Sequence, residues 1–197
     1  MSYWVLFSTN YDDGAFLFKE PESGPDGFEY DEGLSLLKDF PSQKDAIMNF
    51  DPNYPDGIKL YDFVESINSF HVINSKVKDV FQSLNLQGLE FLPISVVNHN
   101  NEVASNDYFI LNPLSSINFI DMKQSEYRMD DLDETQISRM KKLVIANDDV
   151  PKDAKLFRAT TMMDQLFIHD DVKKALEAAN ITGYKLMPAD GWEGFDF

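Results

Sequence analysis

The chain has 197 residues, of which 34 are acidic and 17 basic, so its formal net charge is -17. Hydrophobic residues make up 43% of the sequence, which is enough for a packed core and unlike a disordered chain. There is no cysteine, which excludes disulfides, thiolate chemistry and cysteine-based zinc sites. Lysine and arginine do not cluster, and the acidic charge would repel anionic lipids, so we expect neither nucleic acid nor membrane as a partner.

The expected cellular location rests on two kinds of targeting segment that we do not find in the sequence. The first ten residues have neither the basic nor the apolar region of a signal peptide, and no apolar run reaches the length of a membrane-spanning helix. We therefore expect the protein in the cytoplasm.

The first part of the chain, up to about residue 57, predicts strands joined by turns. Residues 3–7 and 15–18 read as strands, with the turn signal Asp12-Asp13-Gly14 between them, and residues 20–33 read as a loop. We expect one domain over residues 1–197, in which residues 1–57 form a sub-module beside a core of residues 58–197 or pack as part of it.

A short helix is predicted near the end of this part. Ser42 and Asp45 have the spacing of a capping box, and Ala46, Ile47 and Phe50 follow as its apolar residues.

An internal repeat is the most informative feature of the sequence. Residues 73–93 align without gaps with residues 168–188. The alignment predicts two related strand–helix–strand units, at about residues 70–93 and 165–188. The identical residues are Ile73, Val77, Lys78, Asn85, Gly88 and Pro93 in the first copy, and Ile168, Val172, Lys173, Asn180, Gly183 and Pro188 in the second.

Local signals mark the ends of the two predicted helices. Ser75 and Asp170 are residue types that cap helix N-termini, and Gly88 and Gly183 suit the positive φ of an exit turn. A proline is expected to stop each second strand. The apolar faces at helical spacing are Val77, Val80, Phe81 and Leu84 in one helix, and Val172, Ala175, Leu176 and Ala179 in the other.

The remaining segments predict mostly short strands. The polar, acidic stretch of residues 124–134 is a predicted surface loop. Many strands with few helices indicate an α+β fold with mixed or antiparallel sheets. The further predicted strands are residues 94–97, 108–111, 117–120, 143–146 and 156–159.

The sequence offers no catalytic, cofactor-binding or metal-binding residues. His71, His99 and His169 do not have the spacing of metal ligands, and there is no nucleophile or phosphate-binding motif. A pair of carboxylates of the glycosidase type stays open as an alternative, because any acidic chain contains candidates.

Partner-binding candidates are loops in which acids adjoin aromatics, since aromatic residues dominate interface hot spots. Trp4, by contrast, is expected in the core. The candidates are Tyr11, Asp12 and Asp13; Glu29, Tyr30, Asp31 and Glu32; Asp130, Asp131, Asp133 and Glu134; and Trp192, Glu193 and Phe195.

The motifs together resemble immunity protein family eleven of bacterial polymorphic-toxin systems. They cover roughly residues 58–188, and the start at Tyr3-Trp-Val-Leu is also typical. The resemblance implies a small cytoplasmic or periplasmic antidote that binds and occludes a toxin. The gene for the antidote lies beside that of the toxin, and the toxin is often delivered by a contact-dependent or type VI secretion route. Some toxins paired with this family resemble metal-dependent nucleases. It transfers no catalytic residue. The motifs lie in residues 70–93, 108–113, 155–158, 167–176 and 181–183.

The expected partner is therefore a cognate protein toxin with a basic surface, which an acidic antidote would attract. Two alternatives remain: a hydrolase that uses an unrecognised carboxylate site, and a scaffold or assembly protein of the secretion apparatus.

Overall fold

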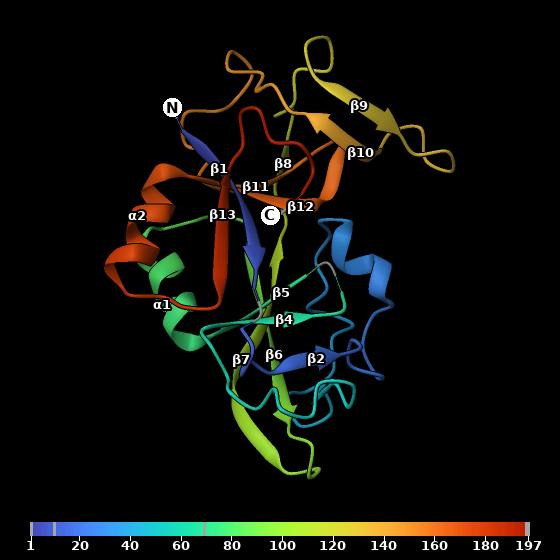
Figure 1. Cartoon of the computed structure of the whole chain (residues 1–197), viewed down its shortest axis with the longest axis vertical. Coiled ribbons are helices and arrows are strands. Elements are labelled where there is room, and N and C mark those ends of the chain that lie inside the picture. Colours follow the sequence, from blue (N-terminus) through green and yellow to red (C-terminus); the bar gives the residue numbers. More distant parts are fainter. Residues whose placement is uncertain (1, 10, 69, 196–197) are drawn as a thin grey trace.

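A computed structural model describes residues 2–9, 11–68 and 70–195 of the chain. These residues form many strands and two α-helices, in the α+β arrangement that the sequence predicts. Figure 1 shows a barrel in the lower half, a sheet in the upper half and both helices on one side. Within the described residues, no helix is long and apolar enough to cross a membrane.

The lower half is a closed barrel of six strands in the order β2-β3-β6-β7-β5-β4. Alternate residues of its strands point inward, among them Met48, Phe50, Leu92, Ile94 and Ile110, which are all buried. The strands are β2 (Phe16–Phe18), β3 (Ile47–Phe50), β4 (Phe63–Ser66), β5 (His71–Asn74), β6 (Leu89–Val97) and β7 (Val103–Pro113).

The upper half is a sheet of five strands in the order β13-β1-β12-β11-β8, with a separate β9-β10 hairpin beside it. Aromatic side chains fill its core, with Tyr3, Phe119 and Phe157 in edge-to-face contact. The strands are β1 (Tyr3–Ser8), β8 (Ser116–Ile117), β9 (Glu126–Met129), β10 (Ile137–Lys142), β11 (Leu156–Ala159), β12 (Met162–His169) and β13 (Tyr184–Pro188).

The two aligned segments have the same order of elements: β5-α1-β6 in the first and β12-α2-β13 in the second. Helices α1 (Ser75–Ser83) and α2 (Asp170–Ala178) each have nine residues. In each unit the two strands flank an antiparallel third strand, β7 in the barrel and β1 in the sheet. The chain thus supplies the middle strand of its second unit from its first residues.

The helices join the two halves. Val77 and Phe81 of α1 and Val172 and Leu176 of α2 are fully buried in one apolar cluster. Asn85 and Gly88 after α1, and Asn180 and Gly183 after α2, all have positive φ, so the exit turns match. The N-caps lie one residue earlier than predicted: Asn74 and His169, not Ser75 and Asp170, accept hydrogen bonds from the first turns.

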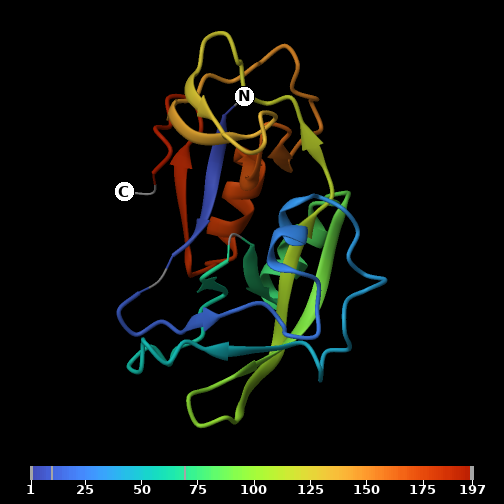
Figure 2. The same ribbon diagram turned by 90° about the vertical axis from the view of Figure 1, so that its right-hand side faces the viewer.

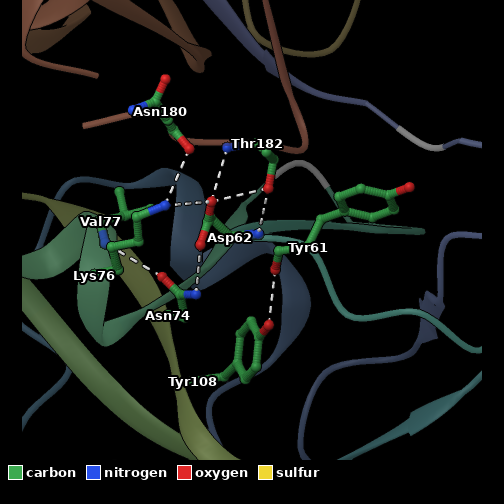
Figure 3. A network of polar contacts seen from close by, with 8 residues as sticks. All are labelled: Tyr61, Asp62, Asn74, Lys76, Val77, Tyr108, Asn180 and Thr182. Atoms are coloured by element: carbon green, nitrogen blue, oxygen red, sulfur yellow. Dashed lines mark hydrogen bonds and ion pairs between the residues drawn. The ribbon is translucent and has the colours of Figure 1, made fainter. Parts of the chain in front are cut away.

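A polar network also connects the halves, centred on the buried Asp62 at the start of β4 (Figure 3). Its carboxylate accepts hydrogen bonds from Asn74 at 2.9 Å and from the hydroxyl of Thr182 at 2.8 Å, and lies 3.3 Å from Lys76 Nζ. Burial opposes the charge of Asp62, but the hydrogen bonds from Asn74 and Thr182 outweigh it and lower its pKa. The carboxylate therefore stays charged and links the first unit to the exit turn of α2.

Three local predictions are wrong. The capping pattern at Ser42 ends in a turn, and residues 47–50 form β3, because Met48 and Phe50 are buried while Ile47 and Asn49 are exposed. The polar stretch 124–134 contains β9, which pairs with β10. Strand β6 continues through Pro93, because β3 pairs with it only from Ser95 onward and no ladder bond is lost.

The predicted strands around β8 are also shorter than expected. Only Ser116–Ile117 pairs as a strand, and Ile120 and Ile145 meet in an isolated bridge, so 117–120 and 143–146 are mostly irregular. Trp4 is half-buried, with Lys173 Nζ lying 3.5 Å above its ring centre.

Candidate partner interface

A cleft of about 640 Å³ lies between the short 3-10 helix η1 (Gly27–Asp31) and the β9-β10 hairpin. Figures 1 and 2 both show η1 on the side of the molecule that carries this hairpin. The cleft brings together two of the acidic segments that the sequence singled out. Its lining residues are Phe28, Asp31, Glu32, Asp130, Asp133, Gln136, Ile137, Ser138, Met163 and Asp164.

Arg158 of β11 binds η1 from the interior of the protein. Its guanidinium is 2% exposed and donates to the carbonyl oxygen of Tyr30 at 2.7 Å, to that of Pro113 at 3.3 Å and to that of Met163. It also pairs with Asp31 at 3.4 Å. A buried guanidinium needs such partners to offset its lost hydration, so the position of η1 is tied to β11.

A second buried group fixes the residues after η1. Glu90 of β6 accepts hydrogen bonds from the hydroxyl of Ser35 and from the amide of Leu36 at 3.0 Å. Asn112 of β7 donates to Glu90 at 3.0 Å and to the carbonyl oxygen of Leu34 at 2.9 Å. Because Glu90 and Asn112 are buried and hydrogen-bonded to residues 34–36, this loop is fixed against strands β6 and β7 of the barrel.

The hairpin side of the cleft is ordered by its own acids. Asp130 accepts the amides of Leu132 and Asp133, and these two bonds lower its pKa. Asp133 in turn accepts from the hydroxyl and amide of Thr135, which lowers its pKa as well. Both carboxylates are therefore charged at neutral pH, and they keep the turn in one conformation.

Asp164 adds an acid that sequence reasoning did not select. The residue as a whole is exposed, but neighbouring atoms remove part of the hydration of its carboxyl, and this burial raises its pKa. The negative charge of Asp31 raises the pKa further. The cleft thus contains more negative charge than its neighbouring cations neutralise.

Two of the predicted contact residues lie in the interior. Tyr30 is 1% exposed and packs on Phe70, and Trp192 is 5% exposed in the aromatic cluster of the sheet. Their rings are covered by the body of the protein, because Arg158 draws Tyr30 inward and the backbone of Leu143 pairs with that of Trp192. Both are core residues in this structure, and we leave them out of the interface that we propose.

The other candidates are spread over different faces. Glu29 bonds the amide of Asp26 in a capping box, Asp131 pairs with Arg128, and Phe195 accepts the indole N–H of Trp192 on its carbonyl oxygen. Glu32 lines the cleft; Glu134 and Glu193 are exposed. Tyr11 and Asp12 lie away from the cleft, beside residues 53–57 in a separate hollow of about 390 Å³, and the adjacent Asp13 pairs with Lys59.

The histidines occupy different places. His71 is buried and bonds Ser8 Oγ through Nδ1 at 2.8 Å, His169 caps α2, and His99 packs on Phe50. Within residues 2–9, 11–68 and 70–195, no three His, Asp or Glu side chains are grouped so that they could hold a metal ion.

Sequence reasoning placed Phe28 at the start of one candidate loop, residues 28–32, without selecting it as a contact residue, and it missed Asp164 and Arg158 altogether. Phe28 is 66% exposed, and an exposed phenylalanine between glycine and acids was a usable signal. Asp164 and Arg158 give no such signal. Their roles depend on contacts of β11 and β12 with η1, which is more than a hundred residues away in the sequence.

A comparison with models of known protein families supports a role as an antidote. The chain matches the model of the immunity protein family Imm11 over residues 9–190, a wider span than the motifs covered. A comparison with curated proteins finds no match. The match extends over nearly the whole chain, and the protein therefore belongs to the immunity protein family Imm11.

Proposed function

We propose that the protein binds a cognate bacterial toxin and neutralises it by covering the surface with which the toxin acts. Membership of the Imm11 family supports the immunity role. The observation that carries the mode of action is the acidic cleft between η1 and the β9-β10 hairpin, on a chain with a net charge of -17. Such a surface complements a basic partner and speeds its encounter.

A nuclease effector of a contact-dependent or type VI system fits this chemistry best. A nuclease must carry a basic surface to hold phosphates, and an acidic antidote can occupy that surface. We propose the cytoplasm as the place of action, because nucleic acids are the target there. The protein then acts by binding and not by catalysis.

The experiment is co-expression with the toxic C-terminal domain encoded by the neighbouring gene. Growth rescue and co-purification of the two proteins are the expected results. The association rate should fall steeply between low and high salt, because steering by opposite charges is screened. A toxin domain that is acidic, or an association rate independent of salt, would contradict the electrostatic part and leave only the binding role.

One observation favours the hydrolase alternative. Asp164 has a raised pKa and lines the cleft together with Asp31, and one carboxyl of an acid–base pair would also have a raised pKa. We rank this function second, because Arg158 already pairs with Asp31 and family membership supports the immunity role. A titration of the toxin with this protein separates the two: a hydrolase neutralises the toxin in substoichiometric amounts, whereas an occluding antidote must be at least equimolar with the toxin.

A further inference from the structure

We infer that the toxin docks on the face formed by η1 and the tip of the β9-β10 hairpin, with Phe28 inserted into the toxin and the cleft carboxylates bound to its lysine or arginine side chains. This inference rests on the proposed function and assigns it to one surface among four candidate loops. We name this face the η1 surface; it consists of Phe28, Asp31, Glu32, Asp130, Asp133 and Asp164.

Phe28 is the first reason for this choice. It lines the cleft and is 66% exposed, on a segment that also exposes Leu34 and Leu37 by 60% and 59%. Large apolar side chains that remain in water together mark interaction sites, and aromatic anchors carry most of the energy of an interface. The acids around Phe28 keep the face soluble when no partner is bound.

The second reason is that the segment is already ordered. Arg158 binds the carbonyl oxygen of Tyr30, and Glu90 binds the amide of Leu36, so buried charges on other strands fix the backbone at both ends. Between them Gly33, with a φ of 66°, packs against Met163 on the cleft wall. A face that is held in place before binding loses little conformational entropy when the partner arrives.

The negative charge of the cleft indicates a partner with a basic surface. The cleft is lined by Asp31, Glu32, Asp130, Asp133 and Asp164, and the described residues that line it include no lysine or arginine. Arg158 behind it is already bound to Asp31 and backbone oxygens, and the pKa of Asp164 is raised first by burial and then by repulsion from the charge of Asp31. Cations brought by a partner relieve this repulsion.

Those cations belong to separate side chains and not to one metal ion. In the part of the chain that the structure describes, no three carboxylates or histidines converge as metal ligands do. Acids spread along two walls of a cleft match several lysines or arginines on a protein surface, which is the chemistry of a phosphate-binding face.

The hollow beside Tyr11 is the rival surface, and its aromatic rings already have neighbours. Tyr11 packs on Tyr61 with ring centres 4.5 Å apart, and Tyr54 packs on Phe16 at 5.0 Å. Asp13 pairs with Lys59 at 3.3 Å and accepts the Tyr61 hydroxyl at 2.7 Å. This end of the molecule therefore supplies matched controls.

The test is the affinity of the full chain for the neighbouring gene's toxic domain, measured by titration calorimetry and by association kinetics. Phe28→Ala should weaken binding at least tenfold, since removal of a hot-spot aromatic costs more than about 1.4 kcal/mol. Glu32→Lys should slow association at least threefold and reduce its dependence on salt. The controls Tyr54→Ala and Asp56→Lys should stay within twofold of the wild type.

Each outcome has one meaning. Wild-type binding that persists within twofold in Phe28→Ala and Glu32→Lys overturns the η1 surface and leaves the antidote role intact. Loss of binding in Tyr54→Ala and Asp56→Lys alone moves the site to the hollow beside Tyr11. If the wild type itself neither binds nor rescues, the proposed function fails and the inference fails with it. Urea unfolding of all four variants checks that each is folded.

Discussion

Asp62 and Thr182 are 120 residues apart in the sequence, yet Asp62 Oδ2 accepts hydrogen bonds from both the amide and the hydroxyl of Thr182, each at 2.8 Å. The contact joins the start of β4 in the barrel to the exit turn of α2 in the sheet. Together with the buried helix faces, it makes the two halves depend on each other (Figure 3).

Replacement of Asp62 by Asn should therefore destabilise the whole molecule. The amide nitrogen would face donors from Thr182, Asn74 or Lys76, and each unsatisfied buried group costs about 1–3 kcal/mol. Urea unfolding should show a loss in that range with one cooperative transition. Asp12→Asn, an exposed position, is the control and should change little; equal effects of the two would refute a role for the network.

The repeat offers a matched pair of glycine substitutions. Gly88 and Gly183 both have positive φ, at 68° and 81°, which costs an alanine about 1–2 kcal/mol. At Gly88 the nearest atom to a new Cβ would be 3.8 Å away, whereas at Gly183 it would overlap the carbonyl oxygen of Phe63. Gly183→Ala should lower the free energy of unfolding by at least about 3 kcal/mol, clearly more than Gly88→Ala.

The helix interface should be sensitive to cavities. Leu176 is fully buried between α2 and the apolar cluster that α1 shares, so Leu176→Ala should cost about 2–5 kcal/mol of unfolding free energy. Its neighbour Glu177 is exposed, and Glu177→Ala should stay within about 0.5 kcal/mol of the wild type. A chemical-unfolding curve for Leu176→Ala that overlays the wild type would show that the helices do not pack as described.

His71 should make stability depend on pH. Burial, and then the charge of Arg158, lower the pKa of His71 from 6.5 to about 3. The unfolded chain binds a proton below its ordinary pKa and the folded protein does not, so stability is complete above about pH 6.5 and falls as the pH drops toward 3. The loss from this group should approach about 1.4 kcal/mol per pH unit.

His71→Gln should flatten this dependence. The measurement is the free energy of unfolding of both proteins at several pH values between about 7 and 4. Parallel curves for the two proteins would mean that His71 titrates normally. An NMR titration of the wild type should agree, with the His71 ring signals unchanged down to about pH 4.

Sequence alone could predict the two helical units, because apolar residues at helical spacing, such as Val77 and Val172, and the exit glycines Gly88 and Gly183 occur in both copies. The capping residues were placed one position too late in each copy. Sequence alone could not place β3, where a local capping pattern at Ser42 competed with the alternation of Ile47 to Phe50. The barrel decided that competition, because Met48 and Phe50 gain burial only as a strand.

The interface that we propose follows from the sequence only in outline. Aromatics among acids identified the segment around Tyr30, but not which ring points outward. Arg158, from the far end of the chain, pulls the Tyr30 backbone inward and leaves Phe28 exposed. A side chain's orientation in a loop depends on such distant contacts, and no local pattern encodes them.

The position of β1 bears on how the protein is made. It is synthesised before the other strands described here, and its two neighbours, β12 and β13, follow more than 150 residues later. At about 5–20 residues per second this strand waits on the order of ten seconds for them, while the barrel strands are already complete. Arg158 also leaves the ribosome late. The nascent chain therefore gains its fixed η1 segment only after β11 has been synthesised, and a chain that stops before Arg158 would lack the ordered η1 surface that we propose for toxin binding.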